Sequence, residues 1–149
     1  MKQPIAIVVV AGFAGGCTFG MTQERFRPAR TPWGIDTRVR TSGGEFAGEL
    51  IEIRKTGLVL LTDKVITLAT NGATETKERR LRLIPYAAVL GSRFEQLNPR
   101  VYITAGRPPP DDRLDELRLV SRFPQGLSPE MLAQLLEAYG QTELAGIEP

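Results

Sequence analysis

Between residues 37 and 97, short apolar stretches alternate with polar turns. The first segment, TRVRTS at residues 37–42, places polar and apolar residues in alternation, which is typical of a β-strand with one face in water. Gly43 and Gly44 follow it, and glycine tolerates the positive φ angles that tight turns require. The pattern predicts a strand that ends in a hairpin turn.

The next segment, EFAGELIEIR, changes the parity of its apolar positions. Phe46, Gly48 and Leu50 fall on one parity, whereas Ile51 and Ile53 fall on the other. A strand that changes parity contains a bulge or a sharp bend, and glycine permits one. We therefore expect a second strand that bends at Gly48.

Further strand-like segments continue to residue 97. LVLLTDKVITLAT (residues 58–70) is compatible with one strand or a strand pair, and NGATETKE (71–78) opens with Asn-Gly and predicts a polar hairpin loop. RRLRLIPY (79–86) alternates, and AAVLGSRFEQL (87–97) predicts a one-turn connection and a last short strand. Together, residues 37–97 predict a mainly β fold, a small closed barrel of five strands.

Residues 98–140 are expected to form a loop, an edge strand and one helix. Residues 101–104 are a strand candidate within the loop, and Pro-rich sequence follows them. In LDELRLVSRFP (114–124), Leu117 and Leu119 alternate with charged residues, which predicts an edge strand.

One C-terminal α-helix is predicted to begin after Ser128. Ser128 is a preferred N-cap residue, Pro129 suits the first helical position, and Gly140 suits the C-terminal cap. The apolar residues at three- and four-residue spacing are Met131, Leu132, Leu135, Leu136 and Tyr139. We expect this stripe to cover an open end or face of the barrel, and residues 141–149 to form a frayed tail.

The N-terminus has the pattern of an export signal. Lys2 provides a short positive region, residues 5–14 are apolar, and the small residues Gly15 and Gly16 precede Cys17. The apolar stretch is shorter than the roughly 20 residues of a transmembrane helix. A plain secretory signal or an uncleaved anchor, with an incidental cysteine, is an alternative interpretation.

A glycine-rich phosphate loop is a further alternative for VVVAGFAGG. That motif requires a helix directly afterwards, whereas Pro28 and Pro32 follow here. We therefore disfavour a dinucleotide site.

The segment Ala14-Gly15-Gly16-Cys17 resembles the lipobox of bacterial lipoproteins, with Ala14 at a position where that family usually has leucine. The resemblance implies cleavage between Gly16 and Cys17 and acylation of Cys17, so that the lipid bilayer is a partner. Each buried CH₂ of an acyl chain contributes about 0.8 kcal/mol to membrane binding.

The same resemblance divides the N-terminal region. Residues 1–16 become a signal peptide, and residues 17–36 become a lipidated N-terminus and flexible tether. Thr18 stands where aspartate marks retention in the inner membrane of such proteins, so the resemblance favours the outer membrane, on its periplasmic side.

The segments GGEFAGELIEI, GLVLL and LRLIPYAAVL resemble Sm-like and SH3-like barrels. The glycine and apolar positions of the first Sm motif are matched by Gly44, Phe46, Gly48, Leu50, Leu58 and Leu60. The Asp and Asn with which that family reads RNA bases are replaced by RKTG at residues 54–57. The resemblance implies a barrel and leaves a cytosolic Sm-like RNA-binding protein as the alternative function.

Composition excludes several chemistries. The chain has 149 residues, no histidine and one cysteine, which excludes a Ser-His-Asp triad, a Cys-His dyad and a Cys/His zinc site. The net charge of +2 gives no strong case for nucleic acid. We expect no cofactor and no metal, and catalysis would have to depend on carboxylates, lysine, tyrosine or hydroxyl groups.

Two charged clusters are weak candidates for ligand binding. The acidic cluster consists of Asp111, Asp112, Asp115 and Glu116, and it lacks the alternating ligands and glycine of a calcium loop. The basic cluster consists of Lys77, Arg79, Arg80 and Arg82, and glutamates interleave with it. The acidic pattern favours a solvated loop or charges at a helix N-terminus, and the basic pattern favours a mixed-charge hairpin.

The sequence therefore predicts a lipid-anchored protein of the cell envelope, not an enzyme, whose barrel serves a structural or protein-interaction role. A further envelope protein is the expected partner. A carboxylate-based envelope enzyme remains open, but no motif favours it.

Overall fold

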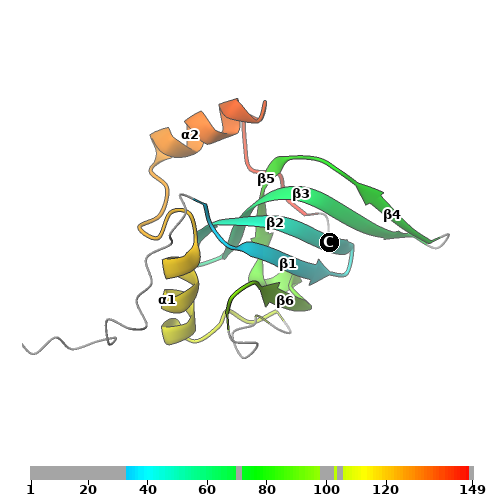
Figure 1. The fold of residues 1–149 in the computed structure, drawn as a ribbon, viewed down its shortest axis with the longest axis horizontal. Coiled ribbons are helices and arrows are strands. Elements are labelled where there is room, and N and C mark those ends of the chain that lie inside the picture. Colours follow the sequence, from blue (N-terminus) through cyan, green and yellow to red (C-terminus); the bar gives the residue numbers. More distant parts are fainter. Residues whose placement is uncertain (1–32, 70–71, 98–102, 104–105, 148–149) are drawn as a thin grey trace, which may run out of the picture.

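The computed structural model describes residues 33–69, 72–97, 103 and 106–147, and it shows a mainly β fold with one antiparallel sheet and two C-terminal helices (Figure 1). The elements are β1 (Asp36–Thr41), β2 (Gly44–Ile53), β3 (Gly57–Ala69), β4 (Gly72–Thr76), β5 (Arg80–Pro85), the 3₁₀ turn η1 (Tyr86–Ala88), β6 (Gly91–Phe94), α1 (Asp111–Val120) and α2 (Pro129–Ala138).

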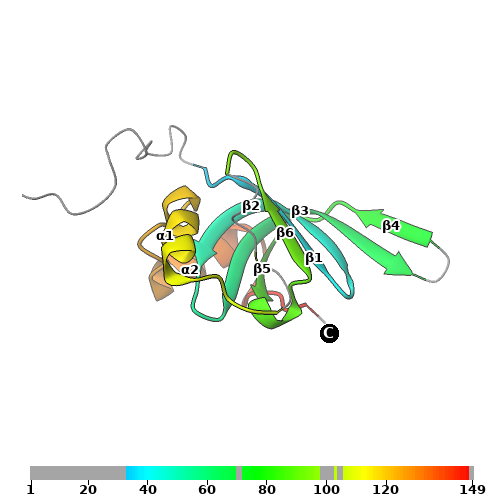
Figure 2. The same cartoon turned by 90° about the horizontal axis from the view of Figure 1, so that it is seen from below.

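The six-stranded sheet has the order β4-β3-β2-β1-β6, and β5 also pairs with β3. The long strand β3 pairs with β2 along one edge and with two strands along the other, where residues 57–62 pair with β5 and residues 65–69 pair with β4. The β3–β4 hairpin consequently extends away from the other strands (Figure 2). Residues 72–76, expected in a loop, are thus a strand.

The expected closed barrel of five strands is wrong. Among the described residues no pairing joins β5 to β6, so the sheet stays open. The edge of β3 away from β2 is divided between β5 and β4, so a sixth strand is added and the β3–β4 hairpin extends outward instead of contributing to a barrel wall.

The expected bend in β2 is confirmed. The pairing register between β2 and β3 shifts at Ala47/Gly48 and again at Leu50/Glu52. A Cβ atom on Gly48 would overlap the carbonyl oxygen of Leu61, so glycine allows the close approach of the two strands.

Hydrophobic side chains pack on both faces of the sheet. Leu60 and Leu61 are consecutive strand residues and therefore point to opposite faces, and both are almost fully buried. The cluster around Leu60 includes Leu117 of α1, and the cluster around Leu61 includes Leu136 of α2. Each helix therefore covers a different cluster.

The expected edge strand at residues 114–124 is wrong, and the structure has two C-terminal helices in place of one. Residues 111–120 form α1, which begins after Pro110. Leu114 and Leu117, one helical turn apart, are buried against the first cluster. Tertiary burial at helical spacing prevails over the local alternation of apolar and charged residues.

The predicted C-terminal helix is confirmed as α2. The Ser128 hydroxyl accepts a hydrogen bond from the Met131 N–H at 3.2 Å, and Gly140 follows the helix with a φ of 67°. Leu132 and Leu135 pack against the second cluster with Leu136.

Residues 141–147 lie along β5, where a frayed tail was expected. The Gln141 side chain accepts from the Leu81 N–H at 2.7 Å and donates to the Leu81 carbonyl at 3.0 Å. Ala145 forms a parallel bridge beside Arg82. This segment covers the edge of β5 that does not pair with β3.

Candidate functional site

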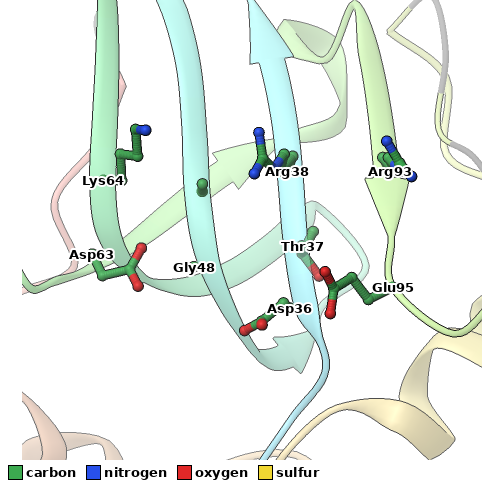
Figure 3. A pocket seen from close by; sticks show the side chains of 9 residues that line it. Asp36, Thr37, Arg38, Gly48, Asp63, Lys64, Arg93 and Glu95 are labelled. Atoms are coloured by element: carbon green, nitrogen blue, oxygen red, sulfur yellow. The ribbon is translucent and has the colours of Figure 1, made fainter. Parts of the chain in front are cut away.

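A polar hollow of about 450 Å³ lies on the sheet (Figure 3). Its lining comes from β1, β2, β3 and the end of β6, and consists of Asp36, Thr37, Arg38, Ala47, Gly48, Asp63, Lys64, Arg93 and Glu95. Ala47 and Gly48 supply the small residues at its centre, and long charged side chains surround them.

Three cations form one margin of the hollow. Ala47 of β2 lies directly opposite Arg38 on one side and Lys64 on the other, and Arg38 lies opposite Arg93. Arg38 pairs with Glu45 at 3.6 Å. Arg93 has no ion pair within the described ranges.

Lys64 forms an ion pair with the neighbouring strand β4, because its ammonium group lies 2.8 Å from a carboxylate oxygen of Glu75. The three cations therefore differ in their freedom to bind a ligand, and Arg93 is the most available.

Three carboxylates form the opposite margin (Figure 3). Asp36 precedes Arg38 by two residues, and Glu95 follows Arg93 by two residues. Each of these two carboxylates therefore lies two positions along the chain from a cation of the other margin. Asp63 is the unpaired residue at the register shift of β3. None of the three carboxylates has an ion pair in the part of the chain that the structure describes.

The acidic margin is not arranged as a metal centre. No group of three or more His, Cys, Asp or Glu side chains among the described residues has the geometry to hold a metal ion. The hollow therefore offers separated positive and negative margins.

A smaller hollow of about 210 Å³ shares Asp36 and Asp63 with the first and includes Trp33. Trp33 is 54% exposed, and the guanidinium of Arg122 lies 4.4 Å from its ring centroid. Glu49 holds this region together by binding the Arg122 Nε at 3.1 Å and the Gly34 N–H at 2.6 Å.

None of the candidate residues of the acidic and basic clusters lines the polar hollow. Gly16 and Cys17, the expected cleavage and lipidation residues, lie outside the described residues. The acidic cluster lies on α1, where Asp115 pairs with Arg118 and Glu116 with Arg113.

The basic cluster, expected in a mixed-charge hairpin, lies on the connection from β4 to β5 and on β5 itself, and these two strands pair with β3 rather than with each other. Glu78 pairs with both Arg80 and Arg82, and Arg79 lies over the Tyr139 ring.

No helix within the described ranges has the length and apolar character to cross a membrane.

Comparison with known proteins gives no further assignment. No protein-family model, curated protein or solved structure matches the chain. The resemblances to the lipobox and to Sm-like barrels are therefore supported only by the sequence segments that carry them.

Sequence reasoning missed the polar hollow. Arg38 is visible as an outward position of an alternating strand, and Ala47 precedes the predicted bend at Gly48. The pairing of Arg38 with Ala47 and Arg93 depends on strand register, which a single sequence does not reveal.

Proposed function

We propose that this chain is a lipid-anchored protein of the cell envelope whose folded part is a non-catalytic interaction domain. The observation that carries the proposal is the segment Ala14-Gly15-Gly16-Cys17 directly after the apolar residues 5–14. An acylated cysteine there would attach the sheet domain to a bilayer through the N-terminal tether.

The surface of the domain supports an interaction role. The polar hollow is an open, charged surface patch, and the charged residues around it include Arg38, Lys64 and Asp63 from neighbouring strands. Surfaces with both signs of charge favour recognition of complementary partners by electrostatics.

RNA binding receives less support. At the position where Sm-like proteins read bases, Arg54 binds the buried Glu52 at 2.8 Å, and Lys55 and Thr56 form an exposed turn. Because the Arg54 guanidinium is engaged in the ion pair with Glu52, Lys55 is the one cation that residues 54–57 present to a phosphate backbone.

The direct test is the intact mass of the mature protein, isolated from membranes of a bacterium that processes lipoproteins. We expect residues 1–16 to be absent and Cys17 to carry acyl chains. A Cys17→Ala variant controls for unrelated lipid attachment, and it should incorporate no labelled palmitate. A mature chain that begins at Met1 with an unmodified sulfur would overturn the proposal.

A further inference from the structure

We propose that the polar hollow binds a zwitterion of the phosphoethanolamine type, with its phosphate against the cations and its ammonium group against the carboxylates. This inference goes beyond the proposed anchor and does not depend on it. The same ligand chemistry occurs in a phospholipid headgroup and in a free phosphodiester.

The cationic margin is arranged to receive a phosphate. Arg38 and Arg93 are directly opposite each other on β1 and β6, and like charges in that position repel. An anion between them removes this repulsion, and guanidinium groups bind phosphate oxygens through two parallel hydrogen bonds. Arg93, without an ion pair in the described part of the chain, is the residue most dependent on such a ligand.

The acidic margin is arranged to receive an ammonium group. Asp36, Asp63 and Glu95 are acceptors only, and an ammonium group has three N–H donors. A simple phosphate would be repelled by these carboxylates. Because carboxylates without an ion pair and Arg93, a cation without one, line the same hollow of the described structure, a ligand that carries both charges is favoured over a simple anion or cation.

The spacing of the two margins suits a short linker between the charges. Asp36 and Arg38 are two residues apart on β1, so their Cα atoms are separated by about 6.6 Å along the strand. Ala47 and Gly48 leave the space between the margins open. A phosphate and an ammonium joined by two carbons can therefore contact both margins at once.

Tryptophan fluorescence can report binding at the hollow. Trp33 is the only tryptophan in the sequence, and it lines the adjoining hollow with Asp36 and Asp63. The full chain in neutral detergent is titrated with glycerophosphoethanolamine while tryptophan fluorescence is recorded. We expect saturable binding. Glycerophosphocholine lacks N–H donors and glycerol phosphate lacks the ammonium, so each should bind about tenfold more weakly.

Variants separate specific binding from general electrostatics. We expect Arg93→Gln and Asp63→Asn to weaken binding about tenfold each. The exposed residues Lys55 and Asp111 lie away from the hollow, so Lys55→Gln and Asp111→Asn make the same charge changes as matched controls and should leave affinity unchanged. Ala47→Leu fills the hollow without a charge change and should abolish binding.

Three results would overturn the proposal. These are the absence of saturable binding, tighter binding of glycerol phosphate than of the zwitterion, or equal losses in the variants and their matched controls. The last result would mean that only the net charge of the protein matters.

A second arm identifies the source of the ligand. Flotation with vesicles of phosphatidylcholine alone is compared with vesicles that also contain phosphatidylethanolamine, for the native protein and for Arg93→Gln. A gain with phosphatidylethanolamine that Arg93→Gln loses assigns the ligand to a membrane headgroup. Binding of glycerophosphoethanolamine without such a gain assigns it to a free phosphodiester.

Discussion

Gly48 lies at the bend of β2 and also lines the hollow. A side chain at this position would overlap the Leu61 carbonyl oxygen and crowd the Thr62 backbone, neither of which can move without disturbing β3. We expect Gly48→Ala to lower the free energy of unfolding by about 1–3 kcal/mol, the cost typical of forced overpacking. Urea denaturation followed by far-UV circular dichroism measures the change.

Gly91 is the matched control, since it also lies in a strand. The atom that a Cβ on Gly91 would approach is the Arg40 Nη2, 3.6 Å away, at the end of a flexible side chain. Gly91→Ala should leave stability unchanged or raise it by up to about 1 kcal/mol through the unfolded state. Equal destabilisation by both substitutions would contradict the role assigned to Gly48.

Tyr86 makes the stability of the domain sensitive to alkaline pH. Burial raises the pKa of Tyr86 from 10.0 to about 12, although the charge of Arg118 acts in the opposite direction. Because the fold favours the protonated phenol, its contribution is complete below pH 10. Unfolding free energy should then fall between pH 10 and about pH 12, by at most about 1.4 kcal/mol for each pH unit.

Tyr86→Phe isolates this effect, since all other titratable groups remain. The variant loses the hydrogen bond from the Tyr86 hydroxyl to the Arg54 carbonyl, 2.9 Å long, which costs about 1 kcal/mol near neutral pH. Above pH 10 its unfolding free energy should fall less steeply than that of the native protein. Identical slopes in urea titrations at pH 8, 10 and 11 would refute the assignment to Tyr86.

Whether a helix could be predicted from the sequence depends on whether the contacts that determine it are local in the chain. α2 was predictable because Ser128, Pro129 and Gly140 mark its two ends within the sequence itself. In α1, Leu117 and Leu119 are two residues apart, which fits a strand, whereas Leu114 and Leu117 are three residues apart, which fits a helix. Burial against residues far away in sequence determines the helix, and local propensity does not reveal it.

The C-terminal segment shows the same limit and leads to a prediction. Gln141 binds both backbone groups of Leu81, a residue sixty positions earlier. Gln141→Ala leaves the Leu81 N–H without this acceptor, and we expect a loss of about 1–3 kcal/mol. Hydrogen exchange at the Leu81 amide should accelerate, because protection there depends on this bond.

Gln134 on the exposed side of α2 is the control for this change. Gln134→Ala removes the same side chain from a surface position and should alter stability by no more than about 0.5 kcal/mol. If Leu81 exchanges at the same rate in Gln141→Ala and Gln134→Ala, the C-terminal segment does not protect the edge of β5.

At the scale of the whole molecule, the candidate site was less predictable than the fold. The hollow requires Arg38, Ala47 and Lys64 to lie side by side on three strands, and their register is set by the bulge at Asp63. The strands themselves follow from apolar patterns within each segment. Register follows from how the whole sheet packs, which no single segment contains.

The two hydrophobic clusters pack on one sheet, and this arrangement predicts how the domain unfolds. Leu60 and Leu61 contribute to different clusters, but both belong to β3, the strand that pairs with β2, β4 and β5. Neither cluster can lose its packing without disturbing the sheet that supports the other. We therefore expect Leu60→Ala and Leu61→Ala each to cost about 2–5 kcal/mol and to leave unfolding a single transition.

Two probes on different parts of the molecule test this cooperativity. Trp33 fluorescence reports the region near Glu49 and Arg122, whereas far-UV circular dichroism reports all strands and helices. In both variants the two probes should give the same urea midpoint, because one sheet joins the two clusters. If Leu61→Ala lowers the midpoint by circular dichroism but not by fluorescence, α2 and its cluster unfold separately, and the two faces are independent units.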